Sequence, residues 1–268
     1  MRDRTHRVAQ HRSAIAGVEA MTLYSNHAFP RHSHDQFGIG IMTLGAQRSW
    51  SGIGPVESQA GDIITVNPGE MHDGLPVRGR ARGWWILYFD PILVARELAG
   101  EDLRGFEIAK PALRDPSLAA SLQQLFIHAT TPSPDRLAAE ESLLWTLMRV
   151  MREHGARRPT DVKSSPCVAK ARQRLDAVPE LATSLAELAA LSGVSRFQLL
   201  RGFAREVGAT PHAYLVQRRV RLVRRLLADG HSPAEAALRT GFADQSHMTR
   251  AFVRQFGITP GRYRSLRG

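Results

Sequence analysis

The sequence has almost no cysteine, little lysine and no long apolar run. Cys167 is the single cysteine among 268 residues, which excludes an internal disulfide and a zinc site built from several thiolates. No apolar run approaches the roughly 20 residues that span a bilayer. The basic start at residues 1–12 is not followed by the apolar core of a secretory signal. Together with the reducing conditions that such cysteine usage suits, these absences predict a soluble, cytoplasmic protein without membrane contact.

Positive charge is abundant and unevenly distributed. The chain carries 36 Lys/Arg and 25 Asp/Glu, a net charge of +11. Residues 167–268 hold 17 of the basic and 7 of the acidic residues, so +10 of the excess lies in the last third. Such a concentration is typical of a domain that binds a polyanion, although a basic and merely well-solvated domain would give the same count.

The same third of the chain contains an internal repeat, since residues 193–214 and 241–263 share a pattern. The matching pairs at an offset of 49 are Arg201/Arg250, Phe203/Phe252, Arg205/Arg254, Gly208/Gly257, Thr210/Thr259, Pro211/Pro260 and Tyr214/Tyr263. Gly193 and Gly241, which open the copies, are 48 apart, so the second copy has one extra residue after its glycine. A repeat of this kind means that one supersecondary unit is used twice.

Each copy reads as a short helix, a glycine turn and a second helix with a polar cap. Ser195 with Gln198 has the spacing of a capping box, and Asp244 suits the N-cap of the matching helix. We therefore predict two helix-turn-helix units. The predicted helices of this region span residues 168–177, 184–191, 195–207, 211–229, 232–240, 244–256 and 260–266.

Helical periodicity separates buried from exposed positions in the second helix of each copy. Leu199, Phe203 and Val207 form one core stripe, and Met248, Phe252 and Phe256 form the other. The outward positions near each helix start are predicted to contact DNA: Arg196, Phe197, Gln198, Leu200 and Arg201 in the first copy, and Gln245, Ser246, His247 and Arg250 in the second. Four further arginines are predicted to contact phosphates: Arg205, Arg218, Arg219 and Arg254.

The helix expected between the copies, over residues 211–229, would be roughly 28 Å long at about 1.5 Å per residue. Successive major-groove faces of a duplex lie about 34 Å apart. One chain could therefore place both second helices in adjacent grooves and cover an asymmetric site. The alternative, a helical bundle with a solvated basic face, does not account for arginine and glutamine at matching helix starts.

The segment from about 168 to 264 resembles the AraC/XylS family of bacterial transcription regulators. The resemblance rests on L-A-E-L-A-A-L-S-G-V-S, L-L-R-G-F, G-A-T-P-H-A-Y-L, R-R-V-R-L-V-R-R-L-L, G-F-A-D-Q-S-H-M-T-R-A-F and F-G-I-T-P-G-R-Y-R. It implies promoter binding through both units. The positions that match base readers of the family are Phe197, Leu200, Arg201, Gln245, Ser246 and Arg250. Leu200 replaces a polar residue found in some members, so readout by the first unit is expected to depend on Arg201 and Gln198.

The first part of the chain has a different sequence pattern, which predicts an arm, a barrel, two helices and a linker. Residues 1–20 are a polar arm, and residues 21–95 alternate short apolar runs with glycine and proline, as the strands of a small barrel do. Residues 96–154 contain two amphipathic helices, and residues 155–167 form a linker before the DNA-binding domain at 168–268. The fold class is thus α+β in two domains, a β-barrel with helices followed by an all-α domain.

His32-Ser33-His34 and the run from Asn67 to His72 resemble the cupin-type sensor domain common in this family. Metal-dependent cupins hold a divalent ion with such histidines and a nearby glutamate, but none follows His34 at the expected distance. We therefore predict no cofactor and no metal, while a three-histidine site stays open. The residues predicted to bind an effector are His32, His34, Trp50, His72 and Trp85.

The resulting prediction is an effector-responsive transcriptional regulator without catalytic activity. Its expected partners are double-stranded promoter DNA, RNA polymerase and an unknown small molecule, and the family resemblance also favours a homodimer through the helices after residue 135. One alternative is a metal-dependent cupin enzyme fused to a DNA-binding domain. Another is an architectural DNA binder that responds to no effector.

Overall fold

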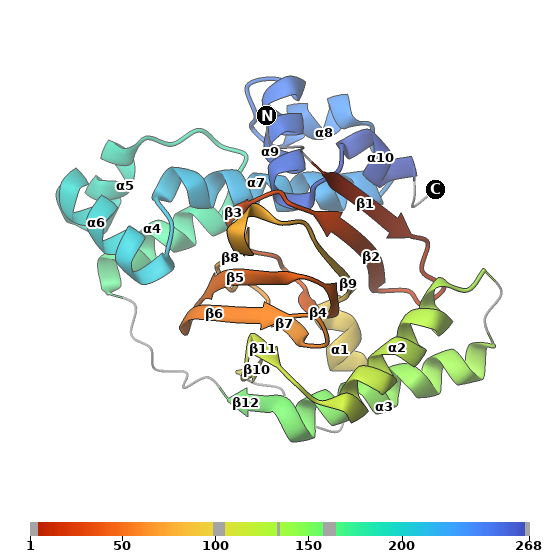
Figure 1. Cartoon of the computed structure of the whole chain (residues 1–268). Helices are drawn as coiled ribbons and strands as arrows, with labels where there is room; N and C mark the ends of the chain where they lie inside the picture. Colours follow the sequence, from red (N-terminus) through yellow and green to blue (C-terminus); the bar gives the residue numbers. More distant parts are fainter. Residues whose placement is uncertain (1–4, 99–104, 133–134, 158–164, 266–268) are drawn as a thin grey trace. The chain divides into compact units, whose positions relative to one another are not determined.

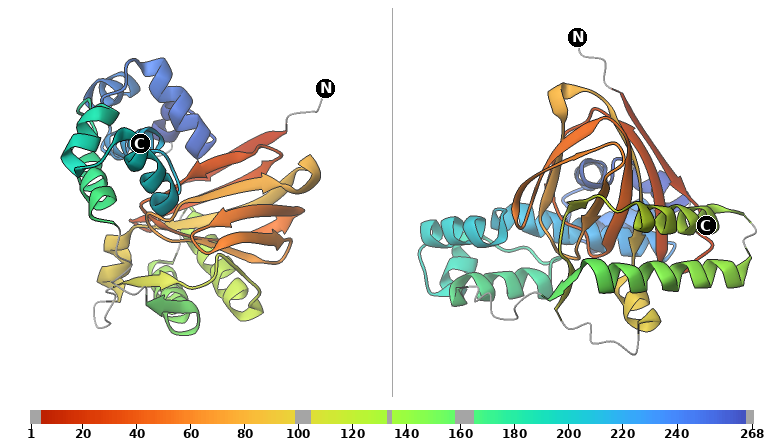
Figure 2. Two further views of the ribbon diagram at one scale, coloured as in Figure 1. Left: turned by 90° about the vertical axis from the view of Figure 1, so that its left-hand side faces the viewer. Right: turned by 60° about the horizontal axis from the view of Figure 1, so that its bottom comes forward.

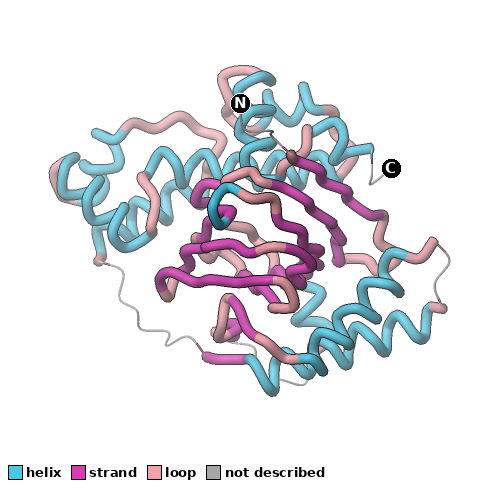
Figure 3. Tube along the Cα trace, viewed as in Figure 1, coloured by secondary structure: helices cyan, strands magenta, loops and turns pink. Residues whose placement is uncertain are grey.

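The computed structural model describes residues 5–98, 105–132, 135–157 and 165–265. The chain divides into two compact units, an N-terminal unit over Met1–Thr160 and a C-terminal unit over Asp161–Gly268. Figure 3 shows that the strands belong to the N-terminal unit, whereas the C-terminal unit consists of helices joined by loops. This mixed α+β organisation confirms the predicted fold class.

Two antiparallel sheets form the barrel of the N-terminal unit (Figure 1). The larger sheet has the order β1 (His6–His11), β2 (Val18–Ser25), β9 (Arg82–Phe89), β4 (Phe37–Leu44), β7 (Ile63–Val66) and β11 (Ala112–Leu113). The smaller sheet has the order β3 (Phe29–His32), β8 (His72–Pro76), β5 (Ala46–Ser51) and β6 (Gly54–Gln59). A short 3-10 helix, η1 (Val77–Gly79), precedes β9, and β10 (Phe106–Ile108) pairs separately with β12 (Gly155–Arg157).

The side chains of the central strand β9 alternate between the two faces of the larger sheet, because successive side chains of a strand point to opposite sides. Trp85, Leu87 and Phe89 belong to the apolar core that includes the helices after the barrel. Trp84 lies on the other face, where its ring contacts Phe29 of β3 in the smaller sheet. Side chains of the two sheets therefore meet inside the barrel, while the outer face of β9 packs on helices.

Three helices follow the main strands: α1 (Pro91–Glu97), α2 (Pro116–Thr130) and α3 (Arg136–His154). The helices α2 and α3 lie side by side (Figure 2), with Leu122, Leu125 and Leu143 almost fully buried between them and the sheet. Each begins at an aspartate whose carboxylate accepts backbone N–H groups, Asp115 for α2 and Asp135 for α3. The two predicted amphipathic helices are confirmed.

Several predicted boundaries of the first half differ from the structure. Residues 6–11 of the predicted arm form β1, because they pair in register with residues 20–25 of β2; residues 1–4 lie outside the described part. The stretch predicted as helical extension also contributes β10 and β11 to sheets. The predicted linker begins with β12 and ends inside α4 (Pro166–Ala177), while its residues 158–164 are outside the described part.

The C-terminal unit contains the seven predicted helices. After α4 they are α5 (Leu185–Ser192), α6 (Arg196–Val207), α7 (Pro211–Ala228), α8 (Pro233–Arg239), α9 (Gln245–Phe256) and α10 (Pro260–Ser265). Gly193 and Gly241 end the first helix of each repeat with positive φ values of 69° and 74°, a conformation that favours glycine. The repeat also extends to the helix starts, since Ser184/Glu187 and Ser232/Glu235 form equivalent capping boxes.

Each helix-turn-helix unit has its own buried aromatic residue, and α7 contacts both units. Leu199 and Phe203 of α6 are fully buried against α4 and α5. Met248 and Phe252 of α9 are equally buried, and Phe252 contacts the ring of Tyr263. These positions confirm the predicted core stripes, with Val207 and Phe256 half-buried at their ends. Within the described part of the chain, no helix has the length and apolar character needed to span a membrane.

Candidate DNA interface and effector-binding face

The first candidate DNA-reading helix is α6, and its start has the predicted cap. The Ser195 hydroxyl accepts the N–H of Gln198 at 3.2 Å, and the Gln198 side-chain oxygen accepts the N–H of Ser195 at 2.9 Å. Phe197 is 69% exposed and Leu200 is 38% exposed. Arg196 and Arg201 are exposed on the same helix. The start of α6 thus presents large apolar and cationic side chains to solvent.

The capping box gives Gln198 a structural contact beside its predicted contact with DNA. A glutamine that reads adenine uses its amide oxygen and nitrogen together in a bidentate contact. In α6 that oxygen accepts the Ser195 N–H, so a bidentate base contact would use the second lone pair of the same oxygen. The structure therefore presents Phe197, Leu200 and Arg201 as exposed candidates, and Gln198 is exposed as well while it takes part in the cap.

The second candidate reading helix is α9. Its N-cap Asp244 accepts the N–H of His247 at 2.6 Å, and this bond holds the pKa of the Asp244 carboxyl below its ordinary value. Gln245, Ser246 and Arg250 are exposed. The ring of His247 lies edge-on against Phe242 at 5.2 Å. His247 is therefore packed on the turn, and the exposed candidates for base contact in this unit are Gln245, Ser246 and Arg250.

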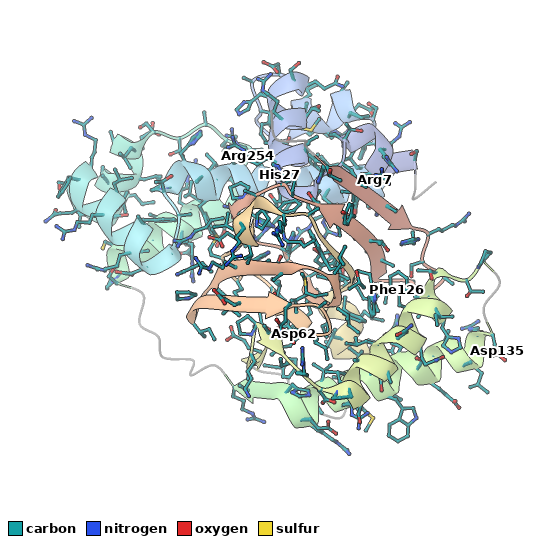
Figure 4. The ribbon with its side chains drawn as sticks, in the orientation of Figure 1. Arg7, His27, Asp62, Phe126, Asp135 and Arg254 are labelled. Carbon is teal, nitrogen blue, oxygen red and sulfur yellow. The ribbon has the colours of Figure 1, made fainter. Side chains whose placement is uncertain are left out.

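The four arginines predicted to contact phosphates have different surroundings. Arg205 is 72% exposed and forms an ion pair with its neighbour Glu206, and Arg254 is exposed on α9 (Figure 4). Arg218 forms an ion pair with Asp176 of α4 at 2.9 Å. The guanidinium of Arg219 donates to three backbone carbonyl groups within the unit, and its contact with a phosphate stays a prediction.

The candidate effector-binding face lies inside the barrel and is centred on three histidines. His32 and His72 are direct cross-strand partners of β3 and β8, and their ring centroids are 4.4 Å apart. His34 lies 4.8 Å from His32 and 5.1 Å from His72 by the same measure. The structure therefore brings these three predicted residues together, and we call them the histidine cluster.

Aromatic rings continue from the histidine cluster across the interior. The ring of Tyr88 is 5.1 Å from that of His34, and Phe29 lies between His32 and Trp84. Beside Trp84 is the fully buried Arg82. Its guanidinium donates to the carbonyl oxygens of Ser25, His27 and Gly74 and to the side chain of Gln47. Burial lowers the pKa of Arg82 to about 10, which leaves it charged at neutral pH.

Two predicted effector residues lie elsewhere. Trp85 points to the outer face of β9, where its ring packs against Phe126 of α2 at 4.8 Å. Trp50 lies under the guanidinium of Arg31 at 3.9 Å, and Arg31 pairs with Asp73. Because Asp73 follows His72 in β8, its side chain points away from the histidine cluster. Both tryptophans therefore belong to the outer surface of the sheets.

The interior residues that sequence reasoning missed are Phe29 and Arg82. Alternation along β9 puts Arg82, Trp84 and Tyr88 on one face, but all eight residues of this strand are apolar, aromatic or buried. The sequence pattern could show that alternate residues share a face. Because neither face of β9 is clearly polar, the sequence did not show which face lies inside the barrel and which packs on helices.

Comparison with known proteins agrees with this arrangement. Residues 15–147 match the model of the AraC-like ligand-binding domain, and residues 188–265 match the model of a helix-turn-helix domain. The chain belongs to the AraC family of transcriptional regulators. An AraC-family regulator combines a ligand-binding domain with a DNA-binding domain, which correspond here to the barrel and to the pair of helix-turn-helix units.

Individual relatives support the same assignment. The uncharacterised helix-turn-helix regulator YbfI of Bacillus subtilis is 29% identical over 230 residues, covering 82% of this chain and 81% of that protein. A putative AraC-like regulator of Streptomyces antibioticus is 35% identical over 140 residues, covering 50% of this chain but only 46% of its own length. The crystal structure of fatty-acid-bound ToxT from Vibrio cholerae aligns over 99% of this chain and 98% of ToxT, with a TM-score of 0.55. At 12% identity, that likeness shows a shared fold.

Proposed function

We propose that this AraC-family regulator binds an asymmetric promoter site by inserting α6 and α9 into two successive major grooves. The observation that carries the proposal is the pair of capped helices that expose different side chains at equivalent positions. The helix between them, α7, has 18 residues and is therefore about 27 Å long. That length suits the spacing of about 34 Å between neighbouring groove faces.

The two helices are expected to read different half-sites. Arg201 and Arg250 occupy matching positions and suit the acceptor edge of guanine. Around them, Phe197 and Leu200 offer apolar contact to thymine methyl groups, whereas Gln245 and Ser246 offer hydrogen bonds. Arg205 and Arg254, at equivalent positions further along the helices, are placed to contact phosphates. The difference between the helix starts makes the expected site asymmetric.

The barrel interior is the proposed effector site, and its response is proposed to be a shift between two states of the chain. An effector that binds one state more tightly moves the population toward it. DNA binding or contact with RNA polymerase would then change with effector concentration. The histidine cluster and the neighbouring Tyr88 supply polar groups, and Phe29 and Trp84 supply apolar surface, the combination that small-molecule sites use.

We propose further that the protein acts in the cytoplasm, without catalytic activity, and that α3 contributes to a homodimer. Trp145 and Leu137 are 69% and 65% exposed on α3, which gives this helix an apolar outer surface. The competing function is a metal-dependent cupin enzyme attached to a DNA-binding domain, and the proximity of His32, His34 and His72 is what favours it. A metal-dependent conversion of a small molecule by the purified chain would establish that alternative.

The decisive experiment is selection of bound sequences from a random DNA pool with the purified full chain. We expect one asymmetric motif with two conserved blocks about one helical turn apart. Affinity for the selected site should fall steeply as salt concentration rises, because phosphate contacts release counterions. Equal affinity for the selected site and for scrambled DNA, or an affinity that does not change with salt, would contradict the proposal.

A further inference from the structure

The side chain of Arg219 contacts segments that belong to both helix-turn-helix units. Arg219 lies near the middle of α7, and its Nε donates to the carbonyl oxygen of Pro179 at 2.7 Å. Its two terminal nitrogens donate to the carbonyl oxygens of Gly241 and Leu181. Residues 179–181 lie between α4 and α5 and lead into the first unit, whereas Gly241 is the turn of the second. One side chain therefore connects both units to the helix between them.

The chemistry of these contacts requires an arginine. The acceptors at residues 179, 181 and 241 lie in turns and bends outside the helices. Hydrogen bonds from a charged donor are stronger than those between neutral groups, and the half-buried position of Arg219 limits competition from water. The planar fork of arginine reaches several acceptors at once, which the single ammonium nitrogen of lysine could not do.

The turn at Gly241 is packed closely against the same segment. A Cβ atom at Gly241 would overlap the carbonyl oxygen of Glu180 and would lie 3.0 Å from the guanidinium carbon of Arg219. At the equivalent Gly193, a Cβ atom would meet nothing within 4 Å. The two glycines have similar φ values of 74° and 69°, so they differ in their surroundings and not in the turn itself. We call Arg219, residues 179–181 and Gly241 the Arg219 junction.

Each unit is also held to α7 by contacts that do not involve Arg219. On the side of the first unit, the Tyr214 hydroxyl donates to Asp176 of α4 at 2.7 Å, and Arg218 pairs with the same carboxylate at 2.9 Å. On the side of the second unit, α8, α9 and α10 pack on α7, and Phe252 of α9 is fully buried. Loss of the Arg219 contacts should therefore leave both units folded and change only how firmly they are placed relative to each other.

The contacts of the Arg219 junction are short compared with one step of DNA. One extra base pair between two half-sites moves them apart by about 3.4 Å along the duplex and rotates one against the other by about 35°. A hydrogen bond of about 3 Å does not persist through a displacement of that size. If the second unit followed a shifted half-site, its turn would move together with α9, which begins at Gln245, and the bond from Arg219 to Gly241 would break.

We infer that Arg219 is a positioning residue that fixes the separation of α6 and α9 and thereby the spacing between the two half-sites. This inference rests on the proposed function. Without the Arg219 contacts, the segment around residue 180 and the turn at Gly241 lose their shared support. Each reading helix would keep its own cap and core, so recognition of a single half-site should persist while the preference for one spacing declines.

The test measures binding of the purified full chain to the selected DNA site and to versions with one base pair inserted or deleted between the half-sites. The unmodified chain should bind the altered sites at least about tenfold more weakly. In Arg219→Ala this spacing ratio should fall by at least about fivefold, because the coupling between the two units is weakened. Circular dichroism and a cooperative thermal transition check that each variant is folded.

Arg219→Lys separates the positioning role from the predicted contact with a phosphate. A lysine keeps the positive charge and can still contact a phosphate, but it cannot connect the carbonyl groups of the junction. Arg219→Lys should therefore lower the spacing ratio as Arg219→Ala does, while its affinity for DNA with a single half-site and its salt dependence stay unchanged.

Arg205→Ala is the matched control. Arg205 is 72% exposed on α6 and is likewise predicted to contact a phosphate, but it lies outside the Arg219 junction. Its replacement should weaken binding to all of these sites alike and leave the spacing ratio as it is in the unmodified chain.

Two outcomes contradict the inference. One is an unchanged spacing ratio in folded Arg219→Lys. The other is an unchanged ratio in Arg219→Ala together with a uniform loss of affinity and a salt slope reduced by about 1, the result expected of a phosphate contact alone.

A pair of glycine variants tests the same junction if Arg219→Ala does not fold. Gly241→Ala and Gly193→Ala place a side chain at similar positive φ values, so both strain the backbone, but only Gly241→Ala disturbs the junction. The spacing ratio should fall in Gly241→Ala alone, and equal ratios in the two variants would refute the inference. Absence of any sequence preference in the unmodified chain would instead refute the proposed function.

Discussion

At the scale of single residues, arginines of this chain differ in role because their surroundings differ. Arg82 is fully buried, and carbonyl oxygens that accept its N–H groups stabilise its charge, whereas Arg219 is half-buried and donates to carbonyl groups of both helix-turn-helix units. Burial lowers the pKa of Arg219 as it does that of Arg82. Arg250 is exposed at the start of α9. Only an arginine of the last kind can leave its surroundings for a base edge without a structural cost.

Replacement of Arg250 tests this distinction. Arg250→Ala should weaken binding to the selected site by about 1–3 kcal/mol and relax the preference at one base pair, because a bidentate contact to guanine is lost. Competition binding against sites mutated at each position measures both effects. Arg254→Ala serves as the comparison and should weaken binding to all sequences alike. A uniform loss in Arg250→Ala would reassign Arg250 to a phosphate.

At the scale of elements, side-chain caps decide where the helices begin. Ser184, Ser195 and Ser232 each form a reciprocal capping box with the residue three positions on. The capped N–H groups have no partner within the helix, so a polar side chain that satisfies them stabilises the first turn. The N–H of Ser184 donates to Glu187 and lowers the pKa of its carboxyl. The repeated cap gives the two copies the same helix starts despite different sequences between them.

The cap of α2 predicts a pH dependence. The Asp115 carboxylate accepts the N–H groups of Leu118 and Ser117 and the ring N–H of His154 at the end of α3. The bond from Leu118 contributes most to holding the pKa of Asp115 below its ordinary value of 3.8. A lowered pKa means that the ionised form is favoured by folding, so its stabilisation is present at neutral pH and is lost as pH falls below that value.

We therefore expect the difference in unfolding free energy between the unmodified chain and Asp115→Ala to be largest near neutral pH. It should shrink as pH falls from about 4 toward the lowered pKa. Urea unfolding at a series of pH values measures it. Asp135→Ala removes the equivalent cap of α3 without the histidine contact and controls for capping alone. A difference for Asp115→Ala that stayed constant down to pH 3 would contradict the assignment.

At the scale of the whole molecule, the chain divides into two compact units, and nearly all its excess positive charge lies in one of them. Residues 167–268 carry a net charge of +10 out of +11. Both candidate reading helices, their caps and their cores are complete within this unit. The information for recognition of DNA is therefore expected to reside in the C-terminal unit alone.

A chain restricted to residues 161–268 should fold and select the same DNA motif as the full chain. Its affinity should fall linearly with the logarithm of salt concentration, since several phosphates are neutralised. Selection from the random pool, followed by binding measurements at several salt concentrations, checks both expectations. A folded fragment that selected a different motif, or none, would show that the N-terminal unit contributes to recognition.

The accuracy of the sequence-based predictions differs between the two units for a physical reason. In the C-terminal unit, helix starts, turns and core stripes depend on residues near one another in sequence, such as Ser195 with Gln198, or Phe203 one turn after Leu199. These local relations predicted all seven helices. In the barrel, β9 lies between β2 and β4, and strand partners so distant along the chain leave no local pattern.

The sequence by itself determined the two helix-turn-helix units, their differing exposed residues, the location of the positive charge and the histidines of the barrel. Only the tertiary structure decided which residues those groups meet. In the structure, Trp85 packs against Phe126, the side chain of Gln198 accepts the N–H of Ser195, and the ring of His34 lies beside that of His72. Arg219 donates to carbonyl groups that precede and follow α7 in the sequence. Helical periodicity and caps act over a few residues, whereas the surroundings of a side chain are set by segments distant in sequence.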